Sequence, residues 1–170
     1  MTRRRKNRAL LVLLLLIVVF PLRAASPTSA VKLSVAGVGP RQLEPTLEES
    51  IARDYAKAWQ TLSAALEARD PALLDQYWAG VAHDKFERLV EDEKRGIEVR
   101  YRDQSHQLQA MFYPADGAAL VLCDTAQLEV QVFSSGKLIH SESFSEKYMV
   151  LMTPAQDRWL VRVLDSVPAS

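Results

Sequence analysis

Apolar and polar residues alternate one by one along much of the last third of the chain, residues 118–167. Between residues 127 and 132, leucine and valine at even positions alternate with glutamine and glutamate at odd positions. This period of two is typical of a strand with one buried and one solvent-exposed face, as in antiparallel sheets. Breaks at Ser134–Gly136 and Pro154–Asp157 predict turns between three such strands. The last strand should place Trp159, Val161 and Val163 on one face.

Earlier in the chain the apolar residues recur every three or four positions, which predicts helices. Residues 46–68 are the longest such stretch, opened by a capping box in which Thr46 is the N-cap and Glu49 reaches back to it. Asp70 and the proline after it predict the start of a short second helix. We expect a third helix to end at Gly96. Its apolar face is made by Ala82, Phe86, Leu89 and Val90.

From residue 97 the period returns to two, which predicts one strand over residues 97–103 and another over residues 106–113. The pair Asp116–Gly117 then predicts a tight hairpin turn into the C-terminal strands. Three helices followed by a meander of strands indicate an α+β fold, with the helices packed on one side of a curved antiparallel sheet.

The first 25 residues have the composition of an export signal. A basic cluster at residues 1–8 precedes twelve uninterrupted apolar residues, 9–20. We predict a cleaved signal peptide or, if residues 9–22 remain uncut, an anchor in the inner membrane. Both place the rest of the chain in an extracytoplasmic compartment, periplasmic or secreted, because the basic cluster stays inside.

The rest of the chain divides into two parts. Residues 26–45 are rich in proline, serine, glycine and valine, and predict a linker with one short strand at Val31–Val35. Residues 46–170 are predicted to form the domain, which is long enough for one hydrophobic core.

Charge is distributed unevenly although the formal net charge is zero. Residues 1–26 contain six basic and no acidic residues, whereas the remainder contains 15 basic and 21 acidic residues. A mildly acidic domain lacks the basic patch that nucleic acid requires, so we predict no nucleic-acid partner. The single cysteine excludes an internal disulfide and a cysteine-based zinc site, and the three histidines have no ligand spacing. We therefore predict no metal and no cofactor.

Three features of this order of elements carry a resemblance to a known superfamily. They are the long helix with Tyr55 and Trp59, the short helix at Asp70, and a last strand that opens as DRWLVRVL after a tight turn. Over residues 46–167 the chain resembles the nuclear transport factor 2-like superfamily, also called cystatin-like. The resemblance implies a cone, in which the long helix lies in a curved sheet around a cavity. Members include ketosteroid isomerases, polyketide cyclases and membrane-tethered, non-catalytic periplasmic domains, so no single function is implied.

Six residues are candidates to line such a cavity: Tyr55, Trp59, Tyr101, Asp103, His106 and Asp124. A carboxyl group in an apolar pocket has a raised pKa and a tyrosine can stabilise an oxyanion, which together suit proton transfer beside a carbonyl. The catalytic positions of the ketosteroid isomerases do not match residue by residue, so we assign no catalytic residue. The alternative, which we favour, is that the tyrosines pack in the core, Asp103 begins a turn, and Asp124 lies at a strand bend or bulge.

We therefore predict a non-catalytic, extracytoplasmic domain for binding or assembly. Its partner would be an apolar small molecule in the cavity, another protein, or a second copy of the chain. The sequence contains none of the phosphate-loop, zinc-protease or nucleophile-elbow motifs, which favours this prediction. The alternative is a small isomerase- or cyclase-type enzyme that uses Asp103 or Asp124 with Tyr55 and Tyr101.

Overall fold

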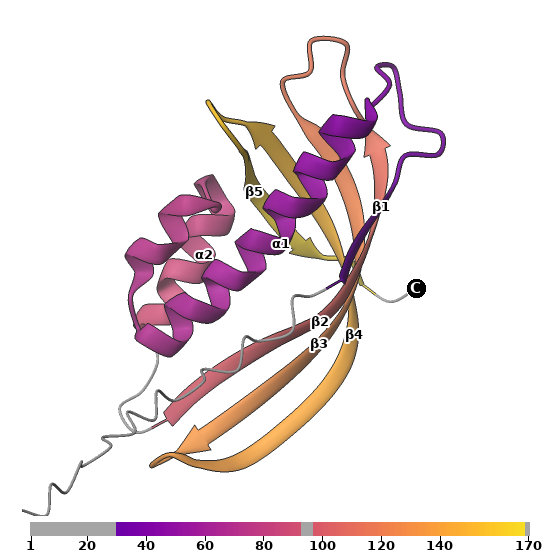
Figure 1. Cartoon of the computed structure of the whole chain (residues 1–170). Helices are drawn as coiled ribbons and strands as arrows, with labels where there is room; N and C mark the ends of the chain where they lie inside the picture. Colours follow the sequence, from indigo (N-terminus) through magenta and orange to yellow (C-terminus); the bar gives the residue numbers. More distant parts are fainter. Residues whose placement is uncertain (1–29, 93–96, 169–170) are drawn as a thin grey trace, which may run out of the picture.

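The computed structural model describes residues 30–92 and 97–168, and Figure 1 shows helices packed against one side of a strongly curved sheet. The elements in chain order are β1 (Ala30–Ser34), α1 (Pro45–Ala68), the 3₁₀ helix η1 (Pro71–Gln76), α2 (Gly80–Glu91), β2 (Ile97–Phe112), β3 (Leu120–Ser134), β4 (Lys137–Pro154) and β5 (Trp159–Ser166). The strands lie side by side in the order β1-β2-β3-β4-β5. The predicted α+β fold class is confirmed.

The sheet is mixed, whereas the sequence predicted an antiparallel one. β1 pairs in parallel with β2, and the remaining neighbours pair antiparallel. β1 falls in segment 26–45, which was predicted to be a linker with one short strand, and Val38 and Leu43 of that segment are also buried in the core. The folded unit therefore begins before residue 46. The predicted signal or anchor, residues 1–25, lies outside the described residues.

α1 is the predicted long helix, but its first turn differs from the prediction. Its N-cap is Glu44, without a side-chain cap, and Pro45 occupies the first helical position. The predicted capping box at Thr46 and Glu49 is therefore wrong. Proline starts the helix instead, because its φ is already helical and it has no N–H group to satisfy. The helix ends at Ala68, as the periodicity predicted.

The two shorter helices follow the predicted order. Asp70 caps η1 as predicted, because its side chain accepts a hydrogen bond from the backbone N–H two residues later. α2 ends at Glu91, earlier than the predicted end at Gly96, and residues 93–96 lie outside the described residues. Across the described part of the chain, no helix is both long and apolar enough to cross a membrane.

Three of the predicted turns lie between strands. In the first, the Gly117 N–H donates a 3.0 Å hydrogen bond to the carbonyl oxygen of Pro114. In the second, Ser135 and Gly136 have φ values of 50° and 75°, the positive values of a tight hairpin turn. The third connects β4 to β5 from Pro154 onward.

β2 is one continuous strand where the sequence predicted two strands with a turn beginning at Asp103. The register shifts directly after Asp103, so that Gln104 is the extra residue of a β-bulge. A bulge changes the side-chain alternation by one residue, and Asp103 and His106 therefore both face the helices. Their cross-strand partners, Leu128 and Ala126, are both buried.

A second register shift changes the predicted face of β5. It falls at Arg162, opposite β4. As a result Leu164 is buried on the same face as Trp159 and Val161. The prediction that Val163 would share this face is therefore wrong, because the bulge turns Val163 to the other side.

The core lies between α1 and the concave face of the sheet (Figure 1). The largest fully buried side chains are Trp78, Tyr55, Ile51, Leu62, Leu66, Leu74, Leu108, Leu120, Leu122, Leu128, Met152 and His106. All but the last are apolar or aromatic. The exception, His106, is a buried polar side chain and therefore needs polar partners.

Candidate functional site

A buried polar cluster links α1 to the sheet. The Tyr55 hydroxyl on α1 donates a 2.8 Å hydrogen bond to Asp124 Oδ2 on β3, and His106 Nδ1 on β2 lies 2.7 Å from the same oxygen. All three residues are 0 % exposed. Because Tyr55 already donates to this oxygen and a carboxylate is an acceptor, we place a proton on His106 Nδ1 as the second donor.

Asp103 extends the cluster to the other nitrogen of the imidazole. Its Oδ2 lies 3.8 Å from His106 Nε2, within reach of an ion pair but beyond a hydrogen bond. Four buried side-chain atoms have no hydrogen-bond partner among the described residues: Trp59 Nε1, Asp103 Oδ2, His106 Nε2 and Asp124 Oδ1. All four belong to His106, its two aspartates and the indole packed against it, so unused hydrogen-bonding capacity is concentrated at one place.

The two aspartates determine the protonation of this cluster. Burial lowers the pKa of His106, but its interactions with Asp103 and Asp124 outweigh burial and raise that pKa above its ordinary value. Burial raises the pKa of Tyr55 well above its ordinary value, and the charge of Asp124 adds to this increase. Tyr55 therefore remains a proton donor, and His106 is a cation over a wider pH range than a free histidine.

Aromatic rings cover the imidazole. The Trp59 ring lies 4.9 Å from the ring of His106 at an interplanar angle of 32°, and the Tyr55 ring meets it edge-on at 5.3 Å. Tyr148 on β4 lies 6.0 Å from Trp59. An indole face beside a charged imidazole is a favourable cation–π arrangement, so Trp59 stabilises the cluster. The same side chain also lines a neighbouring space.

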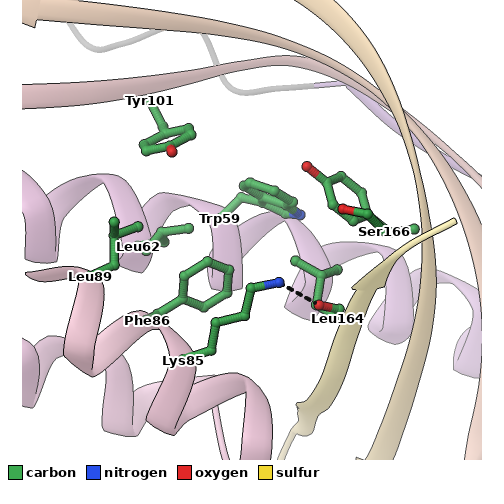
Figure 2. A pocket seen from close by; sticks show the side chains of 9 residues that line it. Trp59, Leu62, Lys85, Phe86, Leu89, Tyr101, Leu164 and Ser166 are labelled. Carbon is green, nitrogen blue, oxygen red and sulfur yellow. Dashed lines mark hydrogen bonds between the residues drawn. The ribbon is translucent and has the colours of Figure 1, made fainter. Parts of the chain in front are cut away.

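That space is a pocket of about 310 Å³ between the helices and the sheet (Figure 2). Its wall consists of Trp59, Leu62, Lys85, Phe86, Leu89, Tyr101, Tyr148, Leu164 and Ser166. The volume lies at the small end of the range for small-molecule sites. Figure 2 shows the Lys85 chain running alongside Phe86, and its Nζ donates a 3.0 Å hydrogen bond to the carbonyl oxygen of Leu164.

The structure divides the six candidate residues between two places. Trp59 and Tyr101 line the pocket. Tyr55, His106 and Asp124 form the buried cluster, and Asp103 borders it. Trp59 belongs to both places, because one side of its ring packs on His106.

The structure does not support the alternative reading of the two aspartates. Asp103 does not begin a turn, because β2 continues through it into the bulge. Asp124 does not lie at a bend or bulge, since it pairs in regular register with Leu108 on one side and Tyr148 on the other. The tyrosine part of that reading holds for Tyr55, which is a core residue with a satisfied hydroxyl.

Sequence reasoning identified two of the nine residues of the pocket wall, Trp59 and Tyr101, and missed the others. Tyr148 had a readable signal, because it alternates with Val150 and Met152 on the buried face of β4. Phe86 was correctly placed on the apolar face of its helix but was not identified as a pocket residue. Lys85 carried no signal, since an exposed lysine beside an apolar face is the ordinary composition of a surface helix.

One group of side chains on α2 has metal-ligand spacing. Ligand atoms of His83, Asp84 and Glu87 lie within 4.8 Å of one another. However, His83 Nε2 already lies 2.9 Å from Asp75 Oδ1. Acidic groups on one exposed helical turn are common without an ion, so we assign no metal there.

Comparison of the chain with protein-family models and with curated proteins found no match. The fold, however, has solved counterparts. The intermembrane-space region of the chloroplast protein ARC6 superposes with a TM-score of 0.62 at 12 % identity, over 76 % of this chain and 100 % of that chain. ActVI-ORFA from Streptomyces coelicolor and Aln2 from another Streptomyces strain each give a TM-score of 0.48 at 14 % identity, over 68 % and 74 % of this chain and 94 % of theirs.

These similarities concern the fold alone. ActVI-ORFA and Aln2 have the nuclear transport factor 2-like fold that the order of elements resembled. A fold does not fix a function, so the choice between a binding domain and an enzyme depends on the site.

Proposed function

We propose that this chain is a non-catalytic binding domain that acts outside the cytoplasm and holds an apolar small molecule in the pocket beside Trp59. The observation that carries the proposal is the composition of the pocket wall. Seven of its nine side chains are aromatic or aliphatic. A mostly apolar, concave wall with a few polar groups is typical of small-molecule sites.

The position of the acid and base groups favours binding over catalysis. Among the described residues, no carboxylate and no histidine belongs to the pocket wall. Asp124 and His106 are fully buried, and the Trp59 ring lies against the imidazole. A general base must come within hydrogen-bond reach of the proton that it removes, and neither of these groups belongs to the pocket wall.

The proposed location rests on the N-terminal sequence. The basic and apolar runs of residues 1–25 support export to the periplasm or out of the cell. An uncut segment 9–22 would anchor the domain in the inner membrane. A protein partner or a second copy of the chain also belongs to the proposal, because several large apolar side chains of β2 and β4 are exposed. They are Met111, Phe112, Leu138, Ile139 and Met149.

Native mass spectrometry of the protein purified from cells tests this proposal. We expect extra mass of small-molecule size that is lost on denaturation. Leu89→Trp, which adds bulk to the pocket wall, should abolish the extra mass, whereas Leu138→Trp at an exposed position on β4 should preserve it. The protein must retain residues 30–44, because they contribute β1 and two core residues. A bare wild-type mass would contradict the proposal, and the same spectrum reports self-association.

A second candidate function, an isomerase- or cyclase-type enzyme, is favoured by one observation. The His106 imidazole lies between Asp103 and Asp124, and unpartnered polar atoms gather around it. Proton transfer would require Trp59 to turn away so that a substrate reaches His106 Nε2. A ligand-bound crystal structure distinguishes the two functions. Contact with His106 Nε2 would support the enzyme, and a ligand against Phe86 with Trp59 unmoved would support the binding domain.

A further inference from the structure

The polar groups of the pocket wall share one chemical property, which is that each can donate a hydrogen bond. They are the Lys85 amine and the hydroxyls of Tyr101, Tyr148 and Ser166. Lys85 is the only charged side chain in this wall as formed by the described residues. A wall of donors around one cation is complementary to a ligand that carries acceptors and negative charge.

Most of this donor capacity is unused. Lys85 Nζ donates to the carbonyl oxygen of Leu164 at 3.0 Å, which uses one of its three hydrogens. Its other contact is with the ring of Phe86, whose centroid lies 5.8 Å from Nζ. Within residues 30–92 and 97–168, the hydroxyls of the two tyrosines and the serine have no hydrogen-bond partner.

The two tyrosines remain donors throughout the physiological pH range. Burial raises the pKa of Tyr101 above its ordinary value. Burial also raises the pKa of Tyr148 to about 12, with smaller contributions from the charges of Glu146, Tyr101 and Asp124. Glu146 and Asp124 act from outside the pocket wall, and there they favour the protonated, hydrogen-bond-donating form of Tyr148.

The charged group lies on the exposed side of the pocket, and most of the apolar surface is buried. Lys85 and Ser166 are exposed, whereas Trp59, Leu62 and Phe86 are buried. Figure 2 shows the Lys85 amine directed towards the strand that carries Leu164 and Ser166, with the Phe86 ring beside the lysine chain. The cation therefore stands at the mouth of the pocket and the apolar surface lies inside.

From this polarity we propose that the ligand is an amphipathic monoanion, such as an aryl or acyl carboxylate. Its apolar body would pack against Trp59 and Phe86, and its anionic head group would pair with Lys85. This inference rests on the proposed function, because it names the chemical class of ligand for the same pocket.

Two fluorescent probes that share one ring skeleton test the inference on the full chain. Anilinonaphthalene sulfonate is an anion, and phenylnaphthylamine lacks the sulfonate. Lys85→Gln should weaken binding of the anionic probe about three- to fivefold, as expected for a solvent-accessible ion pair, and change the Kd of the neutral probe less than about twofold. The glutamine retains an N–H for the carbonyl of Leu164. Lys57→Gln, at an exposed lysine of α1 outside the pocket wall, should change neither Kd.

Leu89→Trp shows whether the probes occupy this pocket, and we expect it to displace both. If it does so, but Lys85→Gln leaves the anionic probe unaffected, the anion inference is wrong and the pocket function stands. If neither probe binds, or if Leu89→Trp leaves both bound, the proposed function fails and the inference fails with it.

Discussion

Asp124 is the acceptor shared by the buried cluster, so Asp124→Ala is expected to destabilise the fold strongly. It leaves the Tyr55 hydroxyl and His106 Nδ1, both in fully buried residues, without their common partner. Removing one partner of a buried ion pair costs about 3–5 kcal/mol, because the remaining charge is uncompensated. We therefore expect the free energy of unfolding to fall by about 4 kcal/mol, out of the roughly 5–15 kcal/mol typical of a whole domain.

Urea denaturation followed by tryptophan fluorescence measures this loss, because Trp59 packs directly on His106. For a slope of about 2 kcal/mol per molar urea, the midpoint should fall by about 2 M. Tyr55→Phe is the matched control. It removes the hydroxyl but leaves the contact between His106 and Asp124. It should cost about 1.5–3 kcal/mol, the range for a hydrogen bond to a charged group.

The double variant shows whether the two donors depend on the same acceptor. Because Asp124→Ala already deprives Tyr55 of its partner, the two losses should be less than additive by about 0.5–3 kcal/mol. A loss below about 1 kcal/mol for Asp124→Ala, or strict additivity, would refute the reasoning that a single buried oxygen holds the cluster together.

The raised pKa of His106 predicts that its contribution to stability is complete below its unfolded pKa, about 6.5, and is lost as the pH rises through the folded value. Urea denaturation at a series of pH values across this interval should show the stability falling as the pH rises. The same fall in a His106→Asn protein would contradict the prediction. A chain that begins at Glu44 lacks β1 together with Val38 and Leu43. It should melt well below one that begins at Ala30, since each lost buried side chain contributes about 1.5–3 kcal/mol; equal melting temperatures would show that β1 is dispensable. Gly117 has a φ of 70°, and a Cβ there would lie 2.6 Å from Arg41 Nη1. Gly117→Ala should therefore lower the free energy of unfolding by about 1–3 kcal/mol, and an unchanged urea midpoint would contradict this.

The elements of the fold were predictable because their signals are local. The 3–4 spacing of apolar residues in α1 and the alternation in β3 and β4 can each be read from residues that are close in the sequence. The turn residues between strands are local signals as well. β1 was predicted as a short strand but could not be assigned to the sheet, because its parallel pairing is with a strand some 75 positions away. The first turn of α1 was mispredicted because Pro45 and Thr46 both offer a start, and proline dominates.

The site depends on register, which a single sequence does not show. The bulge at Gln104 is what places Asp103 and His106 on one face. Without it, their odd separation of three would put them on opposite sides of the strand. The partner of His106 lies on another strand and that of Asp124 on α1, 69 positions away. Polar residues on apolar faces were therefore identifiable as candidates, but their contacts were not.

The pocket and the buried cluster contain different groups with NMR signals of their own, so one NMR titration distinguishes a binding domain from an enzyme. The titrant is the molecule that copurifies with the protein or, in its absence, the anionic naphthalene probe. Our account predicts that the methyl signals of Leu62, Leu89 and Leu164 shift on titration, because these residues line the pocket. It predicts that the imidazole nitrogen signals of His106 stay in place. Shifted His106 signals with unmoved leucine methyls would contradict the account, and would place the ligand at the aspartate–histidine cluster instead.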